Sequence, residues 1–377
     1  MKTLRECVNT DRLINSFLEL ININSLSFSE QAIGEVLAGK LIALGFSVNI
    51  QSYGESFNLV GYKKGSVAGA LPILLSSHMD TVESTEGLRV IRENGLIKTD
   101  GKTVLGADDK SGIAEILEAL QVIQDKGLSV GDIEVVFTSA EERGLYGSKK
   151  FDYSLLQSKH ALVLDSSGSV GKVVVSAPTH DAYTMRISGR SAHAGIEPEK
   201  GINAIMAAAK IISALPDGRI DTVTTANIGT IGGGSATNVV PREVVIEGEM
   251  RSHNLETIES LKKRMFETAT KLAKKNQVRI HIEDKRHYVG FKIADDDPFV
   301  RLIDVALHKS GTFPEHLVYG GGSDANVFNE RGIKSLVLST GMQQPHTTDE
   351  HIYVNDLTSG ALAVLEIVAA FRDFRLS

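Results

Sequence analysis

Short apolar runs alternate with stretches of helical periodicity up to about residue 180 of the chain. Residues 72–77, 133–138 and 161–164 are mostly apolar and include β-branched side chains, which is typical of buried strands. Residues 10–21, 29–45 and 108–126 repeat apolar positions every three or four residues, as amphipathic helices do. This alternation predicts an α/β domain in which helices flank a mixed sheet.

The helix expected over residues 29–45 has an apolar face and a start signal. Ile33, Leu37 and Leu41 fall on one side of it. Ser27 and Glu30 have the spacing of a capping box, in which two side chains bond the free N–H groups at a helix start. We therefore expect both side chains to serve the N-terminus of this helix.

The order of elements changes from about residue 181. The pattern there predicts strand, helix, strand, strand, helix, strand, over residues 181–188, 201–215, 222–231, 242–251, 254–275 and 278–284. This is the order of a ferredoxin-like β-α-β-β-α-β domain. After about residue 290 the first pattern returns, with a helix near 297–310, a strand at 334–339 and a helix from about 356 to 372. We expect a main domain over residues 1–179 and 288–377, and an inserted lid domain over residues 180–287.

Composition and charge exclude several classes of protein. The 377 residues are 42% hydrophobic and 23% charged, which is ordinary for a globular protein of two domains. A net charge of −7 gives no electrostatic reason to bind nucleic acid or an anionic membrane. Cys7 is the one cysteine, so no internal disulfide can form. No run approaches the ~18 apolar residues needed to cross a bilayer, and we expect a cytoplasmic protein.

Side chains able to bind metal follow the apolar runs at several separate points. His and carboxylate side chains are the ligands that zinc and related ions accept. Any one of them alone is explained as well by a turn or a helix cap. Their repeated position beyond strand ends, where open α/β sheets bind ligands, favours one shared site. The candidate ligands are His78, Asp108, Glu142, Asp165 and His346.

Five ligands suit two ions better than one. A single tetrahedral zinc with an open water position accepts fewer, whereas two ions sharing a carboxylate, about 3.5–4 Å apart, can clamp a water and a carbonyl. Glu141, beside the ligand Glu142, is then free to take a proton from the water and pass it to a leaving amine. Asp80 can accept the second N–H of the His78 ring and orient it, or can serve only a turn. The pattern predicts amide hydrolysis.

Other catalytic signatures are missing from the sequence. It contains no Gly-x-Ser-x-Gly elbow, no His-Glu-x-x-His helix and no Gly-x-x-x-x-Gly-Lys phosphate loop. The glycines at 320–322 precede Ser323 and mark either a tight loop or a place where backbone N–H groups approach a substrate. Gly322 and Ser323 are therefore candidate substrate contacts.

The ordered motifs resemble those of a known enzyme superfamily. They are Ser77-His78-Met79-Asp80, Gly106-Ala107-Asp108-Asp109-Lys110, Ser139-Ala140-Glu141-Glu142, Leu164-Asp165 and Pro345-His346-Thr347. The chain resembles the co-catalytic di-zinc peptidases, which include peptidase T, carboxypeptidase G, aminoacylases and succinyl-diaminopimelate desuccinylase. The likeness covers nearly the whole chain, and the amino-acid sequence around Asp108 is most similar to that of peptidase T.

The resemblance implies roles for individual residues. His78 and Asp165 would bind one zinc, Glu142 and His346 the other, and Asp108 would bridge them, with Glu141 as general base. Ser191-Ala192-His193-Ala194-Gly195 matches a lid motif whose histidine reaches the substrate carbonyl, in many members from a partner subunit. Asn238 and Arg251 match lid positions that bind polar and carboxylate groups of the substrate. The resemblance thus also implies a homodimer formed through the lid.

These observations lead to one prediction of function and two alternatives. We expect an exopeptidase that cleaves short peptides in the manner of a tripeptidase or aminopeptidase, with two Zn²⁺ ions for which Co²⁺ or Mn²⁺ could substitute. An N-acyl amino acid hydrolase or a carboxypeptidase could use the same scaffold. A metal-dependent binding protein without turnover is the third possibility, although a binder has no need for Glu141.

Overall fold

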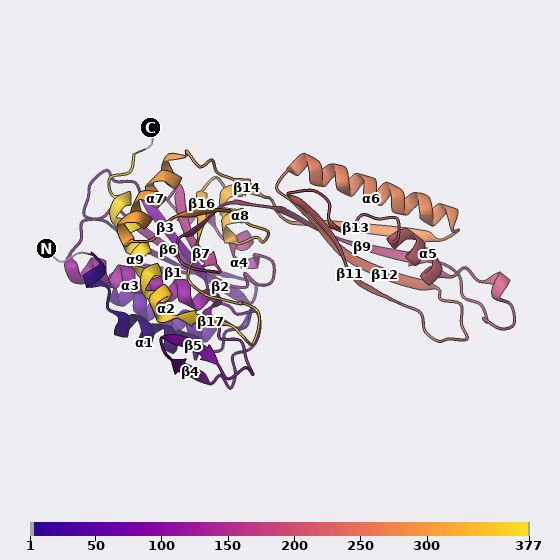
Figure 1. The fold of residues 1–377 in the computed structure, drawn as a ribbon, viewed down its shortest axis with the longest axis horizontal. Helices are drawn as coiled ribbons and strands as arrows, with labels where there is room; N and C mark the ends of the chain where they lie inside the picture. The colour runs from indigo at the N-terminus through magenta and orange to yellow at the C-terminus, as the bar shows by residue number, and fades with distance from the viewer. Residues whose placement is uncertain (1–3, 376–377) are drawn as a thin grey trace. The chain divides into compact units, whose positions relative to one another are not determined.

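The computed structural model describes residues 4–375, and within them the chain forms two compact units. Unit 1 contains residues up to Val175, Ile293–Tyr319 and the chain from Ser323 onward. Unit 2 contains Ser176–Lys292 and Gly320–Gly322. Figure 1 shows each unit with its own sheet and helices.

A mixed sheet forms the centre of unit 1. Its strand order is β1-β2-β6-β3-β7-β16-β8-β14, with β15 beside β8. β3 pairs in parallel with β6 and β7, and β7 pairs in parallel with β16, whereas the remaining pairs along this order are antiparallel. The strands are β1 (Ser47–Tyr53), β2 (Ser56–Lys63), β3 (Ile73–His78), β6 (Ile133–Thr138), β7 (His160–Ser166), β8 (Lys172–Ala177), β14 (Phe291–Lys292), β15 (Glu315–Val318) and β16 (Lys334–Ser339). A small separate sheet is formed by β17 (His351–Tyr353), β5 (Leu96–Thr99) and β4 (Val90–Glu93).

Two groups of helices accompany this sheet. One group packs together through α3 and α9, with α3 against β3 and β7, while α4 and α8 contact each other and the strands β2, β7 and β16. The helices of unit 1 are α1 (Thr10–Ile21), α2 (Gln31–Ala43), α3 (Ala107–Lys126), α4 (Tyr146–Lys150), α7 (Pro298–Ser310), α8 (Asp324–Glu330) and α9 (Val354–Phe371), with short 3-10 helices at Leu4–Cys7 and Tyr153–Leu155.

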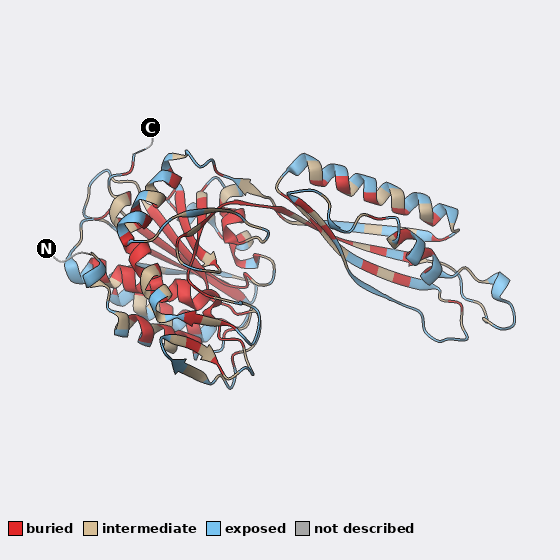
Figure 2. Ribbon diagram, viewed as in Figure 1, coloured by how far each residue is buried: buried red, intermediate tan, exposed pale blue. Residues whose placement is uncertain are grey.

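The burial of the strands explains their sequence. β3 and β6 are buried at every residue, and β7 and β16 at all but one (Figure 2). Parallel strands in the middle of a sheet are covered on both faces and therefore consist of nearly continuous apolar residues. The expected α/β class, with a mixed sheet and flanking helices, is confirmed.

The predicted capping box is wrong. The N-cap of α2 is Glu30, and its side chain makes no capping hydrogen bond. Glu30 instead accepts from Ala140 N–H at 2.8 Å, and the Ser27 hydroxyl donates to Asp80. Long-range partners have displaced the local ones that the spacing suggested.

Unit 2 has the predicted ferredoxin-like order. Its sheet, β10-β11-β12-β9-β13, is antiparallel throughout. Apolar side chains from one face, including Met185, Ile187 and Ile246, form a single core with both helices. The elements are β9 (Thr179–Ser188), α5 (Ala204–Ile212), β10 (Gly218–Arg219), β11 (Thr224–Gly233), β12 (Glu243–Ser252), α6 (Leu255–Lys275) and β13 (Arg279–Tyr288), with a 3-10 helix at Pro198–Lys200. The first helix is shorter than the predicted 201–215.

One described helix, α9, meets the length and composition of a membrane span. Its 18 residues have a mean hydropathy of 1.5, and 56% of that stretch is buried in the fold. The expectation that no stretch comes near this length was therefore too strict. α9 packs against α3 and α7, as the core helix of a domain does.

Candidate active site

The proposed ligands lie at one edge of the unit 1 sheet. His78 is the last residue of β3, and Glu142 follows β6, the parallel neighbour of β3. Asp165 is near the end of β7, the parallel neighbour on the other side, and His346 follows β16. Because parallel strands end at the same edge, residues distant in sequence meet there. Asp108 joins them from the start of α3.

Asp108 stands between the two histidines. His78 Nε2 is 3.0 Å from Asp108 Oδ1, and His346 Nε2 is 3.0 Å from Asp108 Oδ2. Asp165 lies 3.7 Å from His78 Nε2, and Glu142 lies 2.9 Å from His346 Nε2. Two clusters therefore share Asp108, one with His78 and Asp165 and the other with Glu142 and His346.

The charges of these groups fit metal ions. Hydrogen bonds from His346 and His78 lower the pKa of the Asp108 carboxyl, although burial alone would raise it. The pKa of His346 is raised to about 11, first by its hydrogen bond to Asp108 and then by that to Glu142. The same two histidines, His78 and His346, are the ion-pair partners of the carboxylates of Asp108, Asp165 and Glu142. Buried carboxylates with imidazole nitrogens facing them form a donor set suited to divalent cations, which would replace the protons.

Asp80 holds both a histidine and a backbone turn. The Nδ1 of His78 lies 3.0 Å from the Asp80 backbone oxygen and 3.4 Å from its carboxylate. The carboxylate accepts from the N–H groups of Glu141 and Glu142, at 3.0 and 3.2 Å. The backbone of Asp80 is thus closer to the ring than the predicted carboxylate, which mainly fixes the turn after β6.

Glu141 lies in a buried environment that makes its carboxyl hold a proton more readily than a carboxyl in water. It is 9% exposed. Burial raises the pKa of its carboxyl well above the usual value, and the negative charge of Asp165 adds to this effect. A carboxyl with a raised pKa can accept a proton and release it again during one reaction cycle.

The residues expected to contact substrate lie in unit 2, except for Ser323, which belongs to unit 1. Those in unit 2 form two groups. His193 and Asn238 are exposed and lie on adjacent loop segments, joined by the hydrogen bond from Ala194 N–H to the Asn238 carbonyl at 2.9 Å. Arg251, near the end of β12, donates from two nitrogens to Glu249, at 3.0 and 3.1 Å, and from a third to the Gly320 carbonyl at 3.1 Å.

The glycine loop before α8 packs closely against a neighbouring side chain. A Cβ at Gly322 would come within 2.3 Å of the Tyr288 ring, so only glycine fits without a shift. Ser323 in unit 1 caps α8, and its own N–H donates to the Asn326 side chain at 3.1 Å. The tight-loop explanation therefore has direct support at both positions.

Several buried groups around the site were not foreseen. The Glu350 carboxylate accepts from the N–H groups of Leu105, Gly106 and Asp108, at 2.7 to 2.9 Å. Asp109 accepts from the Ser77 hydroxyl, and Asp324 accepts from the Thr138 hydroxyl. Glu350 lies in a polar stretch with no apolar run before it, so the sequence offers no signal for its role.

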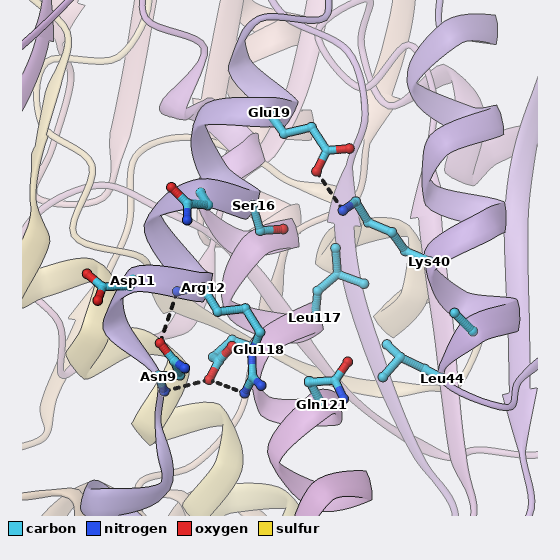
Figure 3. A pocket seen from close by; sticks show the side chains of 12 residues that line it. Asn9, Asp11, Arg12, Ser16, Glu19, Lys40, Leu44, Leu117, Glu118 and Gln121 are labelled. Carbon is cyan, nitrogen blue, oxygen red and sulfur yellow. Dashed lines mark hydrogen bonds and ion pairs between the residues drawn. The ribbon is translucent and has the colours of Figure 1, made fainter.

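A cavity of about 560 Å³ lies elsewhere in unit 1, lined by residues of α1, α2 and α3. Figure 3 shows the side chains that line it. Four of its charged side chains form two ion pairs, Arg12 with Glu118 at 2.7 Å and Lys40 with Glu19 at 2.7 Å. None of the proposed metal ligands lines it, and its volume is no evidence of catalysis.

Comparison with known proteins identifies the class. Residues 58–207 match the family model described as peptidase family M28, and residues 179–277 match the model described as a peptidase dimerisation domain. The uncharacterized protein YqjE of Bacillus subtilis (strain 168) is 40% identical over 368 residues, which are 96% of this chain and 98% of that protein.

Two crystal structures share the fold over nearly their whole length. The aminopeptidase PepT from Bacillus cereus ATCC 10987 is 39% identical, with a TM-score of 0.91 over 97% of this chain and 99% of that one. A tripeptidase from Staphylococcus aureus subsp. aureus Mu50 is 38% identical, with a TM-score of 0.94 over the same shares. The fold and the comparisons together define a metallopeptidase. The chain belongs to the peptidase T-like family of these enzymes.

Proposed function

We propose that the protein is an exopeptidase that hydrolyses short peptides with the help of two divalent metal ions. The observation that carries this proposal is the position of Asp108, whose two carboxylate oxygens each face a different histidine at 3.0 Å. A carboxylate shared by two ligand clusters is the arrangement that a pair of ions about 3.5–4 Å apart requires. The names of the relatives support tripeptides, cleaved from the amino end, as substrates.

The residues have separate tasks in this proposal. His78 and Asp165 would hold one ion, Glu142 and His346 the other, and Asp108 both. Two ions at this position would polarise the scissile carbonyl and lower the pKa of a water molecule. Glu141 takes the proton of the attacking water and delivers it to the leaving amine. Asp80 keeps Glu141 and Glu142 in place through their N–H groups.

Zinc is the metal we propose, because nitrogen and carboxylate oxygen donors suit it, and Co²⁺ or Mn²⁺ would fit the same set. We further propose that unit 2 is a lid and dimerisation domain with limits near residues 180 and 287, that His193, Asn238, Arg251, Gly322 and Ser323 contact the substrate, and that the protein is a cytoplasmic homodimer.

The first test replaces the base. Glu141→Gln keeps the size of the side chain but cannot accept the proton, so we expect turnover to fall by about 10²–10⁴-fold while two metal ions remain bound. Metal analysis and peptide hydrolysis measured on the same sample check both parts. Glu142→Gln is the matched control, since it should remove one ion. A Glu141→Gln protein that loses metal, with normal turnover per bound ion, would contradict the division of roles.

The second test addresses the substrate. Zinc- or cobalt-loaded protein is assayed on dipeptides, on tripeptides, on peptides blocked at either end and on N-acyl amino acids. We expect hydrolysis of tripeptides with a free amino group and none of amino-blocked peptides. Preferential hydrolysis of N-acyl amino acids would favour the acylase alternative, and metal and ligand binding without any turnover would favour a binding protein.

A further inference from the structure

The loop between α1 and α2 reaches three chain segments that carry the proposed active site. The Ile23 carbonyl accepts from Lys110 Nζ at 2.7 Å, near the start of α3. The Ser25 carbonyl accepts from Thr81 N–H at 2.9 Å, just after β3. Glu30 at the end of the loop accepts from Ala140 N–H, just after β6. These contacts hold the segments that bear Asp108, His78 and Glu141 against one loop.

Glu30 is a buried acceptor for the turn that carries Glu141. Its side chain is 1% exposed, and one oxygen accepts from the N–H groups of Phe28 and Ala140, at 2.9 and 2.8 Å. The other oxygen accepts from the Ser56 hydroxyl at 3.2 Å. A buried carboxyl is stable only with such partners, because each of them replaces lost hydration. None of these three donor residues belongs to α2, the helix that Glu30 precedes.

The N–H groups of three successive residues in this turn end on two carboxylates. Ala140 N–H donates to Glu30, and the N–H groups of Glu141 and Glu142 donate to Asp80. Ala140 has a φ of 48°, a left-handed conformation that is unfavourable for a residue other than glycine. Its hydrogen bond to Glu30 helps to hold that conformation. The same conformation sets the direction in which the next side chain, Glu141, leaves the backbone.

We infer that Glu30 is a positioning residue for the general base, acting through the Ala140 N–H to fix the left-handed turn that aims Glu141. The inference rests on the proposed role of Glu141. Glu30 touches neither the proposed metal ligands nor the reacting atoms. It acts on the rate through geometry, because a misplacement of about 1 Å can cost about 10²-fold in rate.

The test compares Glu30 with a carboxylate that has a similar setting but lies away from the site. Glu134 in β6 is also 1% exposed and also accepts two backbone N–H groups, those of Gln157 and Ser158, at 2.8 and 2.9 Å. Kinetics of the metal-loaded full-length variants are measured well below their melting temperatures. We expect Glu30→Ala to lower kcat about 10- to 100-fold with less change in KM, and Glu134→Ala to lower the melting temperature with kcat within about twofold of the parent.

Two further variants separate positioning from stability. Glu30→Gln keeps one carbonyl oxygen for Ala140 N–H and should retain most of the kcat that Glu30→Ala loses. Ala140→Gly removes the cost of positive φ, so Glu30→Ala should reduce kcat less in that background than in the parent. If Glu30→Ala does not fold, the same cycle is run with Glu30→Met, which fills a similar volume but offers no oxygen to Ala140 N–H. A kcat within twofold of the parent for Glu30→Ala, equal losses for Glu134→Ala, or the same factor in both backgrounds would overturn the inference.

A measurement without peptide keeps this test independent of the proposed reaction. Co²⁺ is titrated into metal-free protein and followed by visible absorption. Because Glu142 lies on the same turn, Glu30→Ala should weaken the binding of one ion by about fivefold or more and leave the other nearly unchanged, a second-sphere effect of ordinary size. Unchanged binding of both ions would count against the positioning role. Absence of peptide cleavage by the parent protein, with this shift still present, would instead reject the proposed function.

Discussion

The fold shifts the pKa values of two histidines outside the active site in opposite directions. His160 is 4% exposed and packs against the rings of Phe299, Phe371 and Phe374, at centroid distances of 5.0, 5.8 and 5.1 Å. Burial lowers its pKa to about 4. His316 lies between Asp304 and Asp295, at 2.9 Å from each, and their carboxylates raise its pKa although burial opposes this.

The sign of the His160 effect follows from linkage. The unfolded chain, with a histidine pKa near 6.5, binds the proton at a pH where the folded protein does not. His160 therefore costs no stability above about pH 6.5, and its cost grows as the pH falls towards 4. His160→Leu changes the packing by an amount that is the same at every pH. Apart from this change, we expect the variant to have the parent's free energy of unfolding at pH 7. At pH 4 its free energy of unfolding should be higher than the parent's by about 2–3 kcal/mol. Denaturant unfolding at several pH values checks this.

His316 provides the control of opposite sign. Its raised pKa stabilises the fold below about pH 6.5, and this contribution is lost as the pH rises through the folded value. His316→Leu should therefore lose more stability at pH 5.5 than at pH 8. A His160→Leu difference that does not vary between pH 7 and 4 would show that the ring is hydrated in the folded protein.

Single residues also show what a sequence can reveal about this site. His78, Glu142 and Asp165 were recognisable because each follows an apolar strand, and a strand end is visible in the pattern. Glu30 and Glu350 were not, because a buried carboxylate that accepts backbone N–H groups has the same local sequence as an exposed one. Ala140 lies 110 residues from Glu30, and the partners of Glu350 lie 242–245 residues from it, distances that no local pattern contains.

Helices α3 and α9 meet closely at one glycine. A Cβ at Gly360 would come within 2.2 Å of the Glu115 carboxyl, which is 1% exposed. Burial raises the pKa of this carboxyl well above its usual value. The pair of helices can therefore approach only because position 360 has no side chain.

We expect Gly360→Ala to destabilise the protein by about 1–3 kcal/mol, since added volume in a packed contact forces neighbouring atoms to move. Glu115→Ala in the same chain makes room for the methyl group, so the double variant should lose less than the sum of the two single changes. Gly39→Ala in α2 is the control. No atom lies within 4 Å of that Cβ, and helix propensity should stabilise it by about 0.5–1 kcal/mol. Additive losses at positions 115 and 360 would contradict the steric argument.

The long elements were predictable and the short ones were not. Buried strands such as β3, β6 and β16 have an apolar composition that identifies them, and α6 has a clear helical period. The predictions did not include β8, β14, β15, β17 or α8. The strands β14, β15 and β17 are short, and the tertiary structure sets their limits rather than local propensity. β8 is as long as β3 and is buried at all but one residue, so the apolar residues 173–175 do indicate a strand there.

The assembly of the protein carries a further prediction, a dimer in which His193 serves the partner's active site. A purified mixed dimer is prepared from a Glu141→Gln chain and a His193→Ala chain carrying different tags. One of its two sites then has both an intact base and an intact histidine from the other chain, so about half of the parent activity should return. Peptide hydrolysis by the isolated mixed dimer measures this. Activity no higher than that of the single variants would show that His193 acts within its own chain or not at all.

The order of domains along the chain was accessible from the sequence because the sequence of element types changes twice. The pairing of distant strands was less so, since the parallel neighbours β7 and β16 are separated by the whole of unit 2. The pattern of elements does not identify the family, but the ordered motifs do, and the matches to a peptidase dimerisation domain over residues 179–277 and to two crystal structures confirm it.

The positions of the five proposed ligands also fix when a growing chain can bind metal. Domains fold from the amino end as the ribosome releases them, and His78, Asp108 and Asp165 emerge early. The second cluster needs His346, which follows the whole of unit 2. In the proposed site, a nascent chain would take up at most the first ion until residue 346 has emerged. Peptide cleavage by the proposed two-metal site would then be withheld from chains that still lack His346.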